Sequence, residues 1–196
     1  MTTTTLRELN GFDQAPAVLA DSTLILIDYQ NTYTQGVMEL DGWREALDAA
    51  AELLGRARAA GAKVIHVVND GGEGTPYDIR AEIGRIHPRV APVEGEPTVV
   101  KGKPDAFLGT GLDRLVEEAG NDTVVLAGFM THMCVAFTAQ GAFLRGSHVT
   151  IVADACATRP LRTAAGEVTA DQLHRAALVT VHDLYGVVVA EGSQLL

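Results

Sequence analysis

Short apolar segments rich in β-branched residues alternate with longer segments rich in Ala and Leu along most of this chain. The first short segment, residues 23–27 (TLILI), is followed directly by Asp28 and suits a strand that is buried on both faces. The next segment, residues 43–60, carries apolar residues at helical spacing and stops at Gly61. Strands that alternate with helices in this way predict a parallel sheet between layers of helices.

The same pattern continues to the end of the chain. Strands are expected at residues 23–28, 63–68, 98–100, 123–127, 148–153 and either 179–181 or 187–189, and helices at 43–60, 112–119, 134–145 and 167–178. Residues 69–97 form a long connection, which in a compact domain is often functional. We predict a three-layer α/β/α, Rossmann-like fold with a central, mostly parallel sheet of about six strands. Residues 1–196 are expected to form a single domain, with residues 1–20 as an N-terminal tail or arm.

Charge and composition exclude several classes of protein. The chain has 15 Lys and Arg against 25 Asp and Glu, a formal net charge of −10, which argues against binding to nucleic acid or to an anionic membrane surface. No apolar run approaches the roughly 20 residues that a bilayer requires, and the first residues show no secretory signal. Two cysteines are too few for a disulfide framework, so a cytoplasmic protein with free thiols is expected.

Three reactive side chains follow predicted strands. Asp28 and Lys101 come directly after theirs, and Cys134 comes after a Gly-containing turn, at the start of a predicted helix. Each alone has an ordinary explanation: a capping Asp, a solvated Lys, a buried structural Cys. Ligands of parallel sheets bind at the carboxyl ends of the strands, so together these residues predict a nucleophile beside a base and a cation. The helix N-terminus is expected to lower the pKa of the Cys134 thiol.

Residues 20–190 resemble the isochorismatase-like cysteine hydrolases, a family that includes nicotinamidases, N-carbamoylsarcosine amidohydrolases and streptothricin hydrolase. The resemblance rests on residues 26–31 (LIDYQN), 100–107 (VKGKPDAF) and 128–135 (GFMTHMCV). It implies a catalytic triad of Asp28, Lys101 and Cys134. It also implies an oxyanion hole formed by the backbone N–H groups of Met130 and Cys134, and a cis peptide bond between Phe129 and Met130. Asp105 stands where the family usually has Ser, and is expected to alter the charge of the pocket.

The resemblance also implies a reaction. The Cys134 thiolate would attack an amide, carbamoyl or lactam carbonyl of a small molecule and form a thioester, with Asp28 as base and then acid. No cofactor is implied, and a homo-oligomer, either a dimer or a tetramer, is expected. The residues expected to bind substrate are Tyr29, Gln30, Tyr33, Phe129 and His132. The net acidity of the chain favours a neutral or cationic substrate.

Two other functions stay open. One is an isochorismatase-type hydrolase that cleaves a vinyl ether, although that branch of the family typically lacks the nucleophilic cysteine. The other is a non-catalytic binding or scaffold protein with an idle thiol. No metal site is expected, because His66 and Asp70 flank the second strand without the further Asp and His that the nicotinamidase branch uses. A dinucleotide site is not supported either, since no G-x-G-x-x-G follows the first strand.

Overall fold

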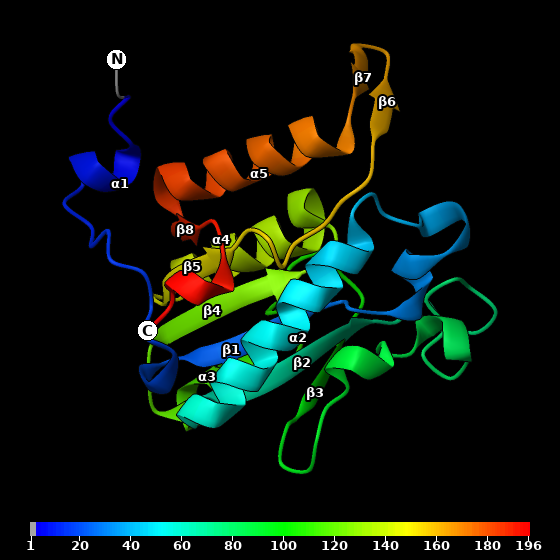
Figure 1. The fold of residues 1–196 in the computed structure, drawn as a ribbon, viewed down its shortest axis with the longest axis horizontal. Helices are drawn as coiled ribbons and strands as arrows, with labels where there is room; N and C mark the ends of the chain where they lie inside the picture. Colours follow the sequence, from blue (N-terminus) through cyan, green and yellow to red (C-terminus); the bar gives the residue numbers. More distant parts are fainter. Residues whose placement is uncertain (1–2) are drawn as a thin grey trace.

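A six-stranded parallel sheet forms the centre of the computed structural model, which describes residues 3–196 (Figure 1). Its strands are β1 (Thr23–Ile27), β2 (Lys63–Asn69), β3 (Thr98–Lys101), β4 (Thr123–Gly128), β5 (His148–Val152) and β8 (Val187–Val189). They are arranged in the order β3-β2-β1-β4-β5-β8, and every neighbouring pair is parallel. The predicted fold class is therefore confirmed.

Helices cover both faces of this sheet. They are α2 (Trp43–Ala60), α3 (Leu112–Ala119), α4 (Ala136–Leu144) and α5 (Ala170–Leu184). The chain moves in one direction along the sheet from β1 to β2 and in the other from β4 to β5, so right-handed crossovers place α2 and α4 on opposite faces (Figure 1). Among the described residues, no helix has both the length and the apolar character needed to cross a membrane.

The reversal of direction occurs between the neighbouring strands β1 and β4, and it creates a crevice beyond their carboxyl ends. Gly128, the last residue of β4, lets the two strand ends approach closely. A Cβ atom at this position would lie only 2.5 Å from the carbonyl oxygen of Ile27. Any larger residue would therefore force the ends of β1 and β4 apart.

The C-terminal part of the chain differs from the prediction. Helix α5 begins at Ala170, where Thr169 and Gln172 form a capping box, and continues to Leu184. Residues 179–181 are therefore helical, and the sixth strand is the alternative at 187–189. Strands β6 (Leu161–Thr163) and β7 (Gly166–Val168) form an antiparallel hairpin that was not predicted, because its short, polar strands show no alternation.

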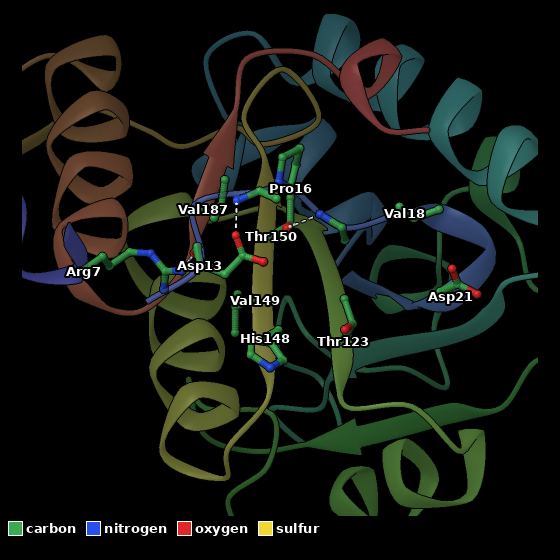
Figure 2. A pocket seen from close by; sticks show the side chains of 12 residues that line it. Arg7, Asp13, Pro16, Val18, Asp21, Thr123, His148, Val149, Thr150 and Val187 are labelled. Carbon is green, nitrogen blue, oxygen red and sulfur yellow. Dashed lines mark hydrogen bonds between the residues drawn. The ribbon is translucent and has the colours of Figure 1, made fainter. Parts of the chain in front are cut away.

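The N-terminal residues are packed as an arm. Helix α1 (Leu6–Leu9) places Arg7 against the end of α5, where the buried guanidinium donates to the carbonyls of Leu184 and Asp13. The chain then crosses the amino ends of β4, β5 and β8 and encloses a cavity of about 240 Å³ (Figure 2). The Ala17 N–H donates to the Thr150 hydroxyl there, at 2.9 Å. The predicted tail or arm is thus an arm from residue 3 onward; residues 1 and 2 lie outside the described residues.

Glu96 ties the end of the 69–97 connection to the sheet and to α2. The connection contains two short helical turns, Glu82–Gly84 and Pro88–Val90. The Glu96 carboxylate accepts from Arg58 at 2.7 Å and lies 2.9 Å from His66 Nε2. Burial alone would raise the pKa of Glu96, but the hydrogen bonds from Arg58, the Val93 N–H and His66 lower it to about 2. Burial also lowers the pKa of His66, which keeps the imidazole neutral.

We predict that the Glu96 cluster makes stability depend on pH in the acid range. Because the pKa of Glu96 is lower in the folded state, its contribution is complete above the ordinary value of 4.5 and is lost as the pH falls towards about 2. Glu96→Gln should reduce the free energy of unfolding by about 1–3 kcal/mol at neutral pH and by progressively less below pH 4.5, as measured by urea titration. The exposed neighbour offers a control, Glu94→Gln, which should change little. An equal loss for Glu96→Gln at neutral and acid pH would contradict this account.

Candidate active site

Asp28 is the first residue after β1 and is fully buried at the carboxyl end of the sheet. Its backbone adopts φ 56°, in the left-handed region that residues other than Gly rarely occupy. The Asp28 N–H donates to the carbonyl of Val67 in β2, at 2.9 Å, which holds this conformation against the neighbouring strand. A buried, strained residue of this kind often marks a functional site.

Lys101 brings the three predicted residues together. It is the last residue of β3, two strands away from β1, and its side chain is fully buried. Its Nζ lies 2.8 Å from Asp28 Oδ2 and 3.2 Å from Cys134 Sγ. Apart from contacts with Lys101 and the Cys134 thiol, the oxygens of Asp28 have no hydrogen-bond partner among residues 3–196. The carboxylate is therefore free to exchange a proton with the thiol.

Cys134 lies in a π-helical turn, Thr131–Val135, which joins β4 to α4, rather than in the helix itself. Only 8% of the residue is exposed. Burial, and next the Asp28 charge, raise the pKa of the thiol to about 12, although Lys101 acts in the opposite direction. The expectation of a lowered pKa is therefore wrong, because loss of hydration and a neighbouring carboxylate outweigh the cation. The thiol is protonated in the resting protein.

Burial also raises the pKa of Asp28, and the Lys101 ammonium opposes that rise. The carboxyl and the thiol thus both hold a proton more tightly than they would in water. Both shifts have the same principal cause, since burial disfavours the charged form of each group.

The turn before Cys134 differs in backbone conformation from the turn that the family resemblance implied. No cis peptide bond occurs in residues 3–196, so the prediction of a cis bond between Phe129 and Met130 is wrong. Met130 instead adopts φ 63° and ψ 60°, and this left-handed residue turns the chain from β4 into the helical turn. The Met130 carbonyl accepts from the Met133 N–H at 2.8 Å, whereas the Met130 N–H donates no hydrogen bond within the described chain.

Three of the residues expected to bind substrate are turned into the protein. The Tyr29 hydroxyl donates to the carbonyl of Ala155. The Gln30 side chain donates to the carbonyls of Gly84 at 2.6 Å and Asn69 at 3.0 Å, and accepts from the Asn69 N–H at 2.9 Å. Phe129 is fully buried against the Tyr29 ring, 4.7 Å between centroids. All three hold the strand ends in place, because their partners are protein atoms.

Tyr33 lies next to the triad. Burial and the charges of Asp28 and Cys134 raise the pKa of its phenol. Its ring lies 5.7 Å from that of Tyr77, edge to face. Tyr77 was missed in the sequence, and the only signal for it was the unusual length of the 69–97 connection. The charges of Asp28 and Cys134 act on the pKa values of both phenols, so both tyrosines lie near these residues.

His132 and Arg159 lie on another side of the site. His132 Nδ1 is 2.6 Å from the Thr158 hydroxyl, and Arg159 is the next residue along the chain. After burial, the Arg159 charge lowers the pKa of His132, and it also acts on the pKa of Tyr77. The Arg159 Nε is buried and has no hydrogen-bond partner in the described part of the chain. Arg159 was missed because it follows the end of β5 only after an irregular segment.

Asp105 does not line this site. Its carboxylate accepts from the Phe107 N–H at 2.9 Å and lies against Gly141 of α4, where a Cβ would come within 2.4 Å of Oδ1. It is also 4.0 Å from Arg145, so the expected effect on the charge of the pocket is wrong.

The two side chains considered as metal ligands have other partners. His66 contacts Glu96, and the Asp70 carboxylate accepts from the Gly72 N–H at 2.9 Å. Within residues 3–196, no group of three or more His, Cys, Asp or Glu side chains is arranged to hold a metal ion.

Comparison with known proteins identifies the family and the fold. The family model described as "Isochorismatase domain" matches residues 22–191. A crystal structure of an isochorismatase from Pseudomonas putida superimposes with a TM-score of 0.95 over all of both chains, at 35% sequence identity.

Two curated proteins are also similar. The secreted isochorismatase effector Isc1 of Verticillium dahliae is 32% identical over 94% of this chain and 95% of its own length. The maleamate amidohydrolase of Pseudomonas putida is 31% identical over 91% of this chain and 84% of its own. A family model that spans most of the chain, together with relatives of this similarity, shows that the chain belongs to the isochorismatase family of hydrolases.

Proposed function

We propose that this chain is a cysteine amidohydrolase that cleaves an amide, carbamoyl or lactam C–N bond of a small molecule. The observation that carries the proposal is the position of Lys101 Nζ, 3.2 Å from the Cys134 thiol and 2.8 Å from the Asp28 carboxylate. A thiol, a base and a cation in mutual contact form the arrangement that covalent hydrolysis of a carbonyl requires. The similarity to a protein named maleamate amidohydrolase supports a C–N bond as the target.

Acylation begins with proton transfer from the Cys134 thiol to the Asp28 carboxylate, while Lys101 stabilises the thiolate. Because the pKa of the thiol is about 12, the thiolate forms only as this transfer takes place. The sulfur attacks the carbonyl carbon, a C–S bond forms, and the carbonyl oxygen becomes an oxyanion. The N–H groups of Met130 and Cys134 are proposed to donate to it. The free Met130 N–H supports this role.

Collapse of the oxyanion breaks the C–N bond, and Asp28 returns its proton to the departing nitrogen. A thioester remains on Cys134. Asp28, again a carboxylate, takes a proton from water as the water attacks the thioester carbonyl. The second oxyanion then expels the thiolate, which regains the proton, and the acid product leaves.

The position of Arg159 favours a substrate that carries a carboxylate. Its Nε is buried and has no hydrogen-bond partner among residues 3–196, although the residue as a whole is only half-buried, and its charge acts on His132 and Tyr77. A guanidinium binds a carboxylate strongly, because the hydrogen bonds between them are charge-assisted. The net charge of the chain favoured neutral or cationic substrates, but a cation close to the site affects the bound substrate more strongly than charges spread over the surface.

Both alternatives explain the site less well. Cleavage of a vinyl ether leaves Cys134 without a role. In a scaffold protein the buried Asp28–Lys101 pair would have no role. Removing these two charges from water costs several kcal/mol for each ion, and a scaffold gives no reason for that cost.

A cytoplasmic location stays our prediction for this chain. Both cysteines are buried and unpaired, as suits a reducing compartment. The similar protein of Verticillium dahliae is named a secreted effector, but that name describes only the Verticillium dahliae protein.

Loss of the nucleophile should abolish turnover. Cys134→Ala and Asp28→Asn should each reduce the release of ammonia from a panel of small amides by about 10³-fold or more. The matched control is Cys156→Ala, because the thiol of Cys156 donates to the Val152 carbonyl at 3.3 Å and has no part in the site. Activity of Cys134→Ala near that of the wild type would contradict the covalent scheme.

The raised pKa of Cys134 makes a second prediction. Alkylation by iodoacetamide, followed by peptide mass mapping, should be slow at neutral pH and should rise with pH towards about 12. Asp28→Asn removes the neighbouring negative charge, so it should lower the pKa of the thiol and speed alkylation at pH 8 even as it abolishes turnover. A rapid wild-type reaction that is independent of pH above neutrality would contradict this assignment.

Arg159 should determine preference between substrates. Arg159→Gln is expected to raise KM for an amide with a carboxylate by about 10- to 100-fold and to leave KM for the matching uncharged amide almost unchanged. Arg162→Gln, in the exposed β6–β7 hairpin, is the control and should affect neither. Equal effects of Arg159→Gln on both amides would show that Arg159 does not bind the carboxylate.

A further inference from the structure

A pair of side chains bonds the turn that carries Cys134 to helix α5. The hydroxyl of Thr131, the first residue of the π-helical turn, lies 2.9 Å from Nδ1 of His174 in α5. Thr131 is only 1% exposed, so its hydroxyl is out of reach of bulk water and needs a partner within the protein. His174 is that partner, although it lies 43 positions later in the chain.

This bond lies at the strained part of the turn. Thr131 follows Met130, whose left-handed backbone turns the chain out of β4, and the residues after it are π-helical. Both conformations are uncommon, and a strained one persists only where its surroundings hold it. The main chain holds the turn on one side, because the Thr131 N–H donates to the Ala157 carbonyl at 3.1 Å. The Thr131 hydroxyl holds it on the side of α5.

We propose that His174 is a positioning residue for the reaction. Its imidazole fixes Thr131, and Thr131 fixes the start of the turn that carries the Cys134 thiol three residues later. The inference rests on the proposed function, in which this thiol must meet both the substrate carbonyl and the Lys101 ammonium, 3.2 Å away. A displacement of about 1 Å at the reacting atoms can reduce the rate about 100-fold, so the bond to His174 acts on the position that matters.

The surroundings of His174 separate this role from ordinary packing. The residue is half-buried and borders a cavity of about 370 Å³, whose lining also includes Glu45 and Cys156. A side chain beside such a cavity is packed on part of its surface only, so a substitution of similar size should leave the fold intact. Burial lowers the pKa of His174 against the opposing charge of Asp171, which keeps the imidazole neutral at neutral pH. A neutral amide can therefore replace it in the bond with Thr131.

The test is a double-mutant cycle in the full chain, with kcat and KM measured for the amide that the wild type hydrolyses fastest. His174→Leu removes the ring nitrogen, and Thr131→Val removes the hydroxyl at nearly the same volume. Each should reduce kcat by about 10- to 100-fold and change KM by less than about twofold, because the nucleophile moves while the substrate contacts stay. The double variant should lose no more than either single variant, since both remove the same bond.

A conservative variant and a control accompany the cycle. His174→Asn places a polar atom of an amide where Nδ1 stands, and it should keep kcat within about threefold of the wild type. His148→Leu is the control, because this histidine is exposed at the amino end of β5, and its loss should change neither constant. Losses that add in the double variant would overturn the proposal, as would equal losses in the Asn and Leu variants of His174.

Alkylation of Cys134 by iodoacetamide tests the positioning apart from turnover. A loosened turn exposes the thiol, so His174→Leu and Thr131→Val should each raise the alkylation rate at pH 8 by about fivefold or more, whereas His174→Asn should not. If the wild type hydrolyses no amide, the proposed function fails, and this measurement still decides the role of His174. Unchanged alkylation in both variants would overturn that role. Far-UV circular dichroism shows which variants fold, and Thr131→Val keeps the test valid if His174→Leu does not.

Discussion

The ion pair between Asp28 and Lys101 is the constraint on which the rest of the site depends. Both side chains are fully buried, and removing two charges from water is unfavourable by several kcal/mol for each. Their 2.8 Å contact offsets this only while the ends of β1 and β3 keep their spacing across β2. The Cys134 thiol lies against the same ammonium, so the geometry that holds the charges together also places the thiol beside the carboxylate.

Backbone strain is concentrated at the same place. Asp28 and Met130, which follow the neighbouring strands β1 and β4, both adopt left-handed conformations that cost of order 1–3 kcal/mol each. Their surroundings hold them there: Gly128 allows the strand ends to approach, and the three hydrogen bonds of Gln30 tie this region to the 69–97 connection. Tyr29, Gln30 and Phe129, which the sequence suggested as pocket lining, thus support the strand ends that position Asp28 and Cys134.

Charge is distributed unevenly over this acidic chain, and each exception has a consequence. Lys101 compensates the buried carboxylate, and Arg159 has a buried guanidinium nitrogen without a partner among residues 3–196, which supports the proposed preference for a carboxylate.

The sequence by itself determined the first five strands of the sheet, most of the helices and the three reactive residues, because apolar spacing and the position of a residue after a strand are local properties. It did not determine the direction of the Cys134 pKa, which depends on burial and on a carboxylate more than a hundred positions earlier in the chain. The inward orientation of Tyr29 and Gln30, the left-handed turn at Met130, and the approach of Tyr77 and Arg159 to the site also required the tertiary structure. In each case the deciding factor is a contact between segments that are distant in sequence, or the loss of hydration that such a contact causes. A local sequence pattern cannot predict either.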